Sequence, residues 1–167
     1  MKLLLTSSGI SNSSIHTALI DLLGKPIASC NALFIPTAIY PFPRGAYMAY
    51  QAISGHAKSP LIQLGWNTLG LLELTALPCL DKNVWVPLVR EADVLLVWGG
   101  DPVFLAYWLK HSGLAELLPS LNELVYVGVS AGSMAVSSTF GETYRNPPNE
   151  SNNAIRSEHI IFDTPQG

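Results

Sequence analysis

Apolar and polar residues alternate along the chain in the way typical of a parallel α/β sheet. Short apolar runs, which indicate strands, are separated by segments in which apolar residues recur every three or four positions, which indicates helices. Strands are predicted over 3–6, 32–36, 69–74, 93–98 and 124–129. The first helix shows its pattern most clearly, with an apolar face formed by Ile15, Ala18, Leu19, Leu22 and Leu23. Because strands and helices alternate, we expect a parallel sheet with right-handed crossovers.

Turn-forming residues mark where the predicted helices begin and end. Gly24 ends the first helix, and a proline-rich loop over 37–44 leads to a helix over 46–53. A further helix is predicted over 83–92. Pro87 is expected to be acceptable only in the first turn of this helix, because a proline deeper in a helix loses a backbone hydrogen bond.

The strand over 93–98 ends in Gly99-Gly100-Asp101-Pro102. Asp101 is predicted to cap the next helix, over 103–111, because an aspartate side chain accepts from the first free N–H groups of a helix. Pro102 then occupies the first helical position, where its missing N–H has no consequence.

The strand over 124–129 ends in Gly128-Val129-Ser130-Ala131-Gly132. A Gly-x-Ser-x-Gly sequence after a strand is typical of a nucleophile elbow. This is a sharp strand-to-helix turn in which small residues let the backbone fold tightly and expose the serine hydroxyl. We therefore predict an unusual backbone conformation at Ser130, at a strand–helix junction.

The two glycine motifs are predicted to meet, because ligands of parallel sheets bind at the carboxyl ends of the strands. If the two strands are neighbours, the N–H groups of Ala131 and of Gly100 or Asp101 can form an oxyanion hole near Ser130. An ordinary strand-to-helix turn explains the paired glycines equally well. Nucleotide binding is a weaker alternative, because the chain has no Gly-x-Gly-x-x-Gly sequence and no Walker-type lysine.

Composition narrows the class of protein. The chain has 167 residues, of which 49% are hydrophobic and 13% charged, so we expect a single α/β domain over 1–167 with both faces of its sheet covered. The net charge of −3 and the scattered lysines and arginines argue against nucleic acid and against an anionic membrane as partners. The expected partner is a small molecule or a peptide.

The cysteines and the first residues concern cofactors and location. Cys30 and Cys79 form no Cys-x-x-Cys pair, and no histidine stands at metal-ligand spacing, so neither a metal nor another cofactor is predicted. The opening apolar run stops at Thr6, too early for a signal peptide, and no stretch has the length of a membrane span. The sequence therefore predicts a cytoplasmic protein.

The chain resembles the peptidase E (dipeptidase E) family of serine peptidases from its first residue to about Tyr144. The resemblance is carried by both glycine motifs and by the segments Glu73-Leu74-Thr75-Ala76-Leu77-Pro78, Gly113-Leu114-Ala115 and Ser133-Met134. It implies a three-layer α/β/α fold of the class I glutamine amidotransferase type with a mostly parallel sheet, in which serine replaces the amidotransferase cysteine. It also implies hydrolysis of short peptides with an N-terminal aspartate.

Site residues carry over from the family only where its motifs match. The resemblance implies that Ser130 is the nucleophile and that Ala131, with Gly100 or Asp101, supplies the oxyanion donors. Many members have asparagine in place of Asp101. Glu142 follows the motif where the family has acidic residues and is the candidate acid, although a solvated loop glutamate explains it at least as well.

The histidine departs from the family pattern. In the family it ends a hydrophobic strand, whereas here the only downstream histidine, His159, precedes the apolar run over 160–162. Three strand residues span about 10 Å, which places His159 towards the wrong edge of the sheet. His16, His56 and His111 match no better.

A serine without a base is a poor nucleophile. We therefore expect much slower cleavage of Asp-X dipeptides than in complete members, with Ser130→Ala and His159→Ala changing the rate little.

Two further expectations and two alternatives follow. The family continues beyond the point where this chain ends, so either the C-terminal portion is missing or the chain is a shortened relative whose tail has diverged. In both cases we expect the chain to cover its open apolar surface by self-association. The main alternative is a non-catalytic relative that binds a small acidic ligand or acts as an interaction module. An amidotransferase-like or nucleotide-handling protein is disfavoured, since the motif carries serine and no phosphate motif is present.

Overall fold

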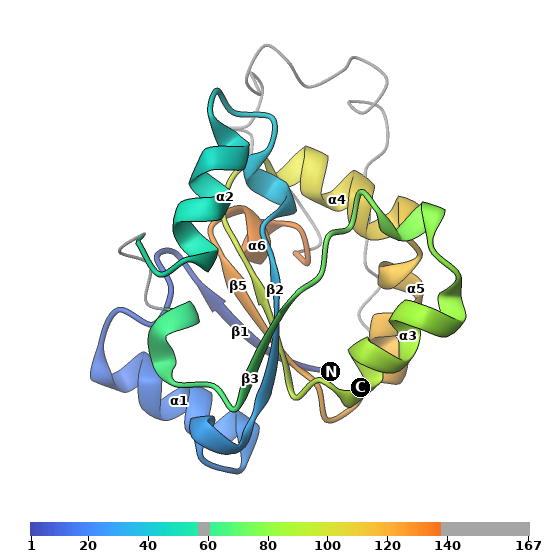
Figure 1. Cartoon of the computed structure of the whole chain (residues 1–167). Coiled ribbons are helices and arrows are strands. Elements are labelled where there is room, and N and C mark those ends of the chain that lie inside the picture. Colours follow the sequence, from blue (N-terminus) through green and yellow to red (C-terminus); the bar gives the residue numbers. More distant parts are fainter. Residues whose placement is uncertain (57–60, 138–167) are drawn as a thin grey trace.

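A five-stranded sheet forms the centre of the computed structural model, which describes residues 1–56 and 61–137. Its strands lie in the order β1-β5-β4-β2-β3, and every neighbouring pair is parallel (Figure 1). The strands are β1 (Lys2–Thr6), β2 (Asn31–Ile35), β3 (Thr68–Leu71), β4 (Val94–Val97) and β5 (Val125–Val129). The carboxyl ends of all five strands therefore meet at one edge, where the candidate site was predicted.

Helices cover both faces of this sheet (Figure 1). One face carries α1 (Ser13–Leu23) and α2 (Gly45–Ile53); the other carries α3 (Lys82–Glu91), α4 (Pro102–His111) and α5 (Leu114–Leu117). The short helix α6 (Ala131–Met134) follows β5 directly, and 3-10 turns occupy Ile27–Ser29, Thr37–Ile39, Ile62–Leu64, Leu77–Cys79 and Leu118–Ser120. The predicted three-layer α/β/α fold is confirmed.

Two apolar cores lie between the layers, and the central strands contribute to both. In β4, Val94 and Leu96 pack in the core beneath α1 and α2, whereas Leu95 and Val97 pack in the core beneath α3, α4 and α5. All four side chains are fully buried. The continuous apolar run in the sequence is thus explained by burial on both faces, as is typical of parallel sheets.

The third strand is shorter than predicted. β3 ends at Leu71, although the apolar run suggested that it continued to residue 74. Leu72 still donates a hydrogen bond to the carbonyl of Phe34, at 2.9 Å, and then the chain turns. Leu72 and Leu74 remain buried, because the turn after the strand packs them into the core.

Pro87 lies in the middle of α3 and not in its first turn, so that prediction was wrong. A proline there leaves the carbonyl of Asn83 without its helical donor. Both residues are exposed, so water can bind that carbonyl, and the helix is held from its other side by the buried side chains of Trp85 and Val89. Packing therefore outweighs the local cost of the proline.

Candidate active site

Ser130 is the single residue that connects β5 to α6. Its backbone angles are φ 50° and ψ −111°. Among the described residues, Ser130 and Arg44 are the only non-glycine residues with positive φ. The side chain of Ser130 is exposed, whereas the residues of β5 before it are buried. The junction and the unusual backbone predicted from the sequence are both present.

The two glycines of the motif are required by close packing around this turn. A Cβ on Gly128 would lie 2.7 Å from the backbone nitrogen of Ser133, and one on Gly132 would lie 2.3 Å from the carbonyl oxygen of Val97. Both distances are far below van der Waals contact. Gly-x-Ser-x-Gly is thus the sequence that lets α6 lie directly on the ends of β5 and β4.

Thr6, at the end of β1, holds the turn from a third side. Its carbonyl accepts from the N–H of Ser130 at 2.9 Å and from the hydroxyl of Ser133 at 2.8 Å. The N–H of Thr6 donates to the hydroxyl of Ser133 at 3.0 Å, and its own hydroxyl donates to the carbonyl of Gly128 at 2.9 Å. The hydroxyl of Ser133 is therefore occupied by hydrogen bonds with the backbone of Thr6, and Ser130 carries the exposed hydroxyl of the motif.

Tyr126 fastens α6 from inside the core. The side chain is completely buried on β5, and its hydroxyl donates to the carbonyl of Gly132 at 2.7 Å. Burial raises the pKa of Tyr126, so its neutral form is favoured in the folded protein.

We expect Tyr126→Phe to change stability in two ways. At neutral pH it should lower the free energy of unfolding by about 1–3 kcal/mol, because the Gly132 carbonyl loses its buried donor. In the wild type, the pKa of Tyr126 is higher in the folded protein than in the unfolded chain. Its contribution to the free energy of unfolding is therefore full below about pH 10 and falls above that pH. Removing this phenol should make that fall smaller.

Urea unfolding at neutral and at alkaline pH measures both effects. Tyr50→Phe is the matched control, because Tyr50 is 58% exposed on α2 and should change neither value. An alkaline loss of stability as large in Tyr126→Phe as in the wild type would contradict the prediction.

The paired glycines lie beside Ser130, because β4 and β5 are neighbours. A Cβ on Gly99 would lie 3.3 Å from the Cβ of Ser130 and 3.8 Å from its Oγ. Gly100 has φ 144°, and a Cβ there would lie 2.1 Å from the carbonyl oxygen of Ala38. The structure thus brings together the two motifs that the sequence singled out.

Asp101 has a structural role in this loop. It is fully buried, and its carboxylate accepts from the N–H groups of Val103 and Phe104 at 2.9 and 3.0 Å, which confirms the predicted helix cap. Its own N–H donates to the carbonyl of Ala38 at 2.7 Å. That N–H therefore faces Ala38, and the choice between Gly100 and Asp101 as an oxyanion donor stays a prediction.

Of the other residues considered, Ala131 lies next to Ser130, the histidines of the described ranges lie elsewhere, and two candidates are not described. The N–H of Ala131 has no acceptor among the described residues. His56 bonds to the hydroxyl of Ser54 at 2.8 Å, and His111 stacks on Tyr107. No histidine in the described part of the chain hydrogen-bonds to Ser130. Glu142 and His159 lie outside the described residues and stay predictions.

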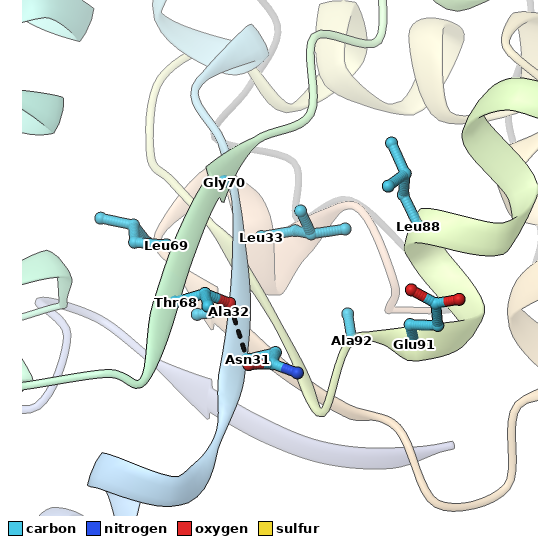
Figure 2. Close-up of a pocket in the computed structure, with 9 residues that line it drawn as sticks. All are labelled: Asn31, Ala32, Leu33, Thr68, Leu69, Gly70, Leu88, Glu91 and Ala92. Atoms are coloured by element: carbon cyan, nitrogen blue, oxygen red, sulfur yellow. Dashed lines mark hydrogen bonds between the residues drawn. The ribbon is translucent and has the colours of Figure 1, made fainter.

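A cavity elsewhere on the molecule is separate from this site. It measures about 260 Å³ and lies between β2, β3 and α3 (Figure 2). Leu88 and Glu91 of α3 line one wall, and Leu33 and Gly70 line the other. Ser130 is not part of its lining.

Within the described residues, no three histidine, cysteine or acidic side chains are grouped so that they could hold a metal ion.

The model of peptidase family S51 matches residues 3–157. The chain belongs to this family. Two solved structures share its fold. A candidate peptidase E protein from Listeria monocytogenes EGD-e is 19% identical, with a TM-score of 0.60 over 89% of this chain and 69% of that one. A peptidase from an acI-B1 Actinobacterium is 23% identical, with a TM-score of 0.56 over 81% and 56%.

No curated protein sequence matches this S51 member. In the described ranges, 1–56 and 61–137, no helix combines the length and the apolar character that crossing a bilayer requires.

Proposed function

We propose that this S51 peptidase is a serine peptidase with Ser130 as its nucleophile, acting on short peptides with an N-terminal aspartate. The observation that carries the proposal is the conformation of Ser130, an exposed hydroxyl at positive φ on a turn packed against three strands. Unusual backbone of this kind is concentrated at functional sites, where surrounding contacts hold it. Family membership supports peptidase chemistry, and the aspartate preference comes from the family resemblance.

The N–H groups that would stabilise the oxyanion are those of Ala131 and of Gly100 or Asp101. Donors fixed before the reaction stabilise developing charge without reorganisation, which makes such groups a large part of acyl-transfer catalysis. Ala131 is held by the packing of α6, and Gly100 is held by its contact with Ala38. Both lie next to Ser130, in sequence or through Gly99.

A base is the element that decides turnover. The candidate base, His159, lies outside the described residues, and it precedes the apolar run over 160–162 instead of ending it. For that reason we propose low activity, with a site that keeps its shape and donors but activates its nucleophile little. The same sequence feature supports the second candidate, a non-catalytic relative that binds a small acidic ligand or serves as an interaction module.

Two measurements on the full chain separate these functions. We expect hydrolysis of Asp-Leu to be so slow, far below that of an active S51 peptidase measured in parallel, that Ser130→Ala and His159→Ala change the measured rate little. A fluorophosphonate, which is far more electrophilic than a peptide, should still label Ser130, and the label should be absent from Ser130→Ala.

Each other outcome has a distinct meaning. Binding of Asp-Leu without labelling would support the non-catalytic relative. Rapid turnover that both substitutions abolish would show that His159 reaches Ser130 and that the site is fully competent.

Self-association is the proposed way in which the chain covers its apolar edges. Leu3 and Leu5 on edge strand β1 are 41% and 44% exposed, and Leu71 on the opposite edge strand is 51% exposed. Unpaired strands with apolar side chains favour association. We expect light scattering to show oligomers. The double variant Leu3→Lys with Leu5→Lys should dissociate them, whereas Ile20→Lys on α1 should leave them intact. A monomer at high concentration would contradict this.

The cytoplasmic location stays a prediction.

A further inference from the structure

One carboxylate at the carboxyl edge of the sheet gathers hydrogen bonds from two loops. Glu73 follows β3, and its Oε1 accepts from the hydroxyls of Thr37 and Thr75 at 3.2 and 3.0 Å and from the Thr75 N–H at 3.2 Å. Its Oε2 accepts from the hydroxyl of Tyr40. Burial and this bond raise the pKa of Tyr40, so its hydroxyl remains a donor. Glu73 therefore fastens the turn after β2 to the turn after β3.

The turn that Glu73 fastens is also in contact with the candidate site. Ala38 belongs to this turn, lies between Thr37 and Tyr40, and is completely buried. Its carbonyl oxygen accepts the N–H of Asp101 at 2.7 Å and leaves no room for a Cβ on Gly100. Because these are backbone contacts, the turn cannot move without shifting Gly100 or breaking the bond to Asp101.

The contacts continue from Gly100 to Ser130 through Gly99, whose Cβ position is 3.3 Å from that of Ser130. We propose that Glu73 is a positioning residue, which holds the turn over 37–40 and thereby sets the place of the Gly100 backbone beside Ser130. The catalytic meaning of this position rests on the proposed function. The positional effect itself does not, because it can be measured without turnover.

A residue that only fastened two loops would act differently. Its loss would loosen the turns at residues 37–40 and 73–75, and the effect would end there. A positioning residue must also affect the backbone on the far side of Ala38. The N–H of Asp101 reports this, because amide hydrogen exchange measures how often its bond to Ala38 opens.

Glu73→Gln tests the inference. Glutamine keeps the size of the side chain but removes the charge and replaces one accepting oxygen with a donor. We expect the Tyr40 pKa to fall toward its ordinary value, seen as tyrosinate absorbance at lower pH and assigned by comparison with Tyr40→Phe. Exchange at the Asp101 amide should accelerate about tenfold. A hydrogen bond to a charged group typically contributes enough free energy to change an equilibrium constant by that factor or more. Glu91→Gln, on the exposed side of α3, should change neither.

The outcomes are separable. A lowered Tyr40 pKa with unchanged exchange at Asp101 would overturn the inference and leave Glu73 as a local fastener. If Glu73→Gln does not fold, Tyr40→Phe removes one donor only and must still accelerate exchange at Asp101; unchanged exchange there would overturn the inference too.

A second pair of outcomes separates this inference from the proposed function. Faster exchange at Asp101 in a chain whose Ser130 takes no fluorophosphonate would contradict the proposed function and leave the positional effect standing. Where Ser130 is labelled, Glu73→Gln should slow the labelling step and not the initial binding of the probe.

Discussion

Gly132→Ala should lower the free energy of unfolding by about 3 kcal/mol, because the added methyl group has no place to go. Its Cβ would lie 2.3 Å from the carbonyl oxygen of Val97 and 3.2 Å from that of Trp98. Both atoms belong to the backbone, at the last residue of β4 and at the residue after it, and that strand is hydrogen-bonded on both sides. The helix α6 must therefore move away from the sheet.

Moving α6 should also disrupt the site. The Ser130 turn and the N–H of Ala131 are positioned by the contact of Gly132 with β4. We therefore expect Gly132→Ala to lose labelling of Ser130 by a fluorophosphonate even at temperatures where the protein remains folded. Thermal unfolding and mass spectrometry of the labelled peptide measure the two effects separately.

Gly70→Ala is the matched control for this substitution. Both glycines lack positive φ, and a Cβ on Gly70 would also meet an atom at 2.7 Å. That atom, however, is the end of the flexible Leu33 side chain, which can rotate away. Gly70→Ala should change stability by less than about 1 kcal/mol and leave labelling intact. Equal losses in the two variants would show that backbone contact is not what makes Gly132 necessary.

The sequence predicted the fold well because its local signals agree with its packing. The run Val94–Val97 is apolar throughout since both of its faces are buried, and Asp101 and Pro102 mark the start of α4 by their own side-chain chemistry. Where a local signal had two explanations, the prediction failed. Leu72 and Leu74 are apolar because they are buried in the turn after β3, and not because they extend that strand. Pro87 is tolerated because the opposite side of its helix is buried.

The candidate site was predicted in part for the same reason. Gly-x-Ser-x-Gly reports a local steric requirement, so the turn at Ser130 could be inferred from five residues. The contacts that hold it are distant in sequence: Thr6 lies more than a hundred residues before Ser133, and Tyr40 meets Glu73 across two loops. No local pattern indicates such pairs. Only the segment beginning at Glu73, noted for its family likeness, gave a signal that this region mattered.

Ser130→Gly should stabilise the protein while removing its proposed nucleophile. At φ 50° and ψ −111°, Ser130 has a conformation that glycine adopts easily and that a residue with a Cβ adopts at a cost of roughly 1–3 kcal/mol. Glycine loses about 0.5–1 kcal/mol more conformational freedom on folding, which offsets part of the gain. The expected net gain is about 1 kcal/mol, or a rise in Tm of roughly 2–4 °C.

Two further variants show whether the gain comes from relieved backbone strain. Ser130→Ala keeps the Cβ and the strain, so its stability should stay within about 0.5 kcal/mol of the wild type, although it too loses the label. Arg44→Gly relieves the other positive φ among the described non-glycine residues, φ 64°, and should leave labelling of Ser130 unchanged. A Tm of Ser130→Gly no higher than that of Ser130→Ala would mean that the turn stores no strain. Separate responses of stability and labelling are what we expect of a residue whose conformation is kept for function at the expense of stability.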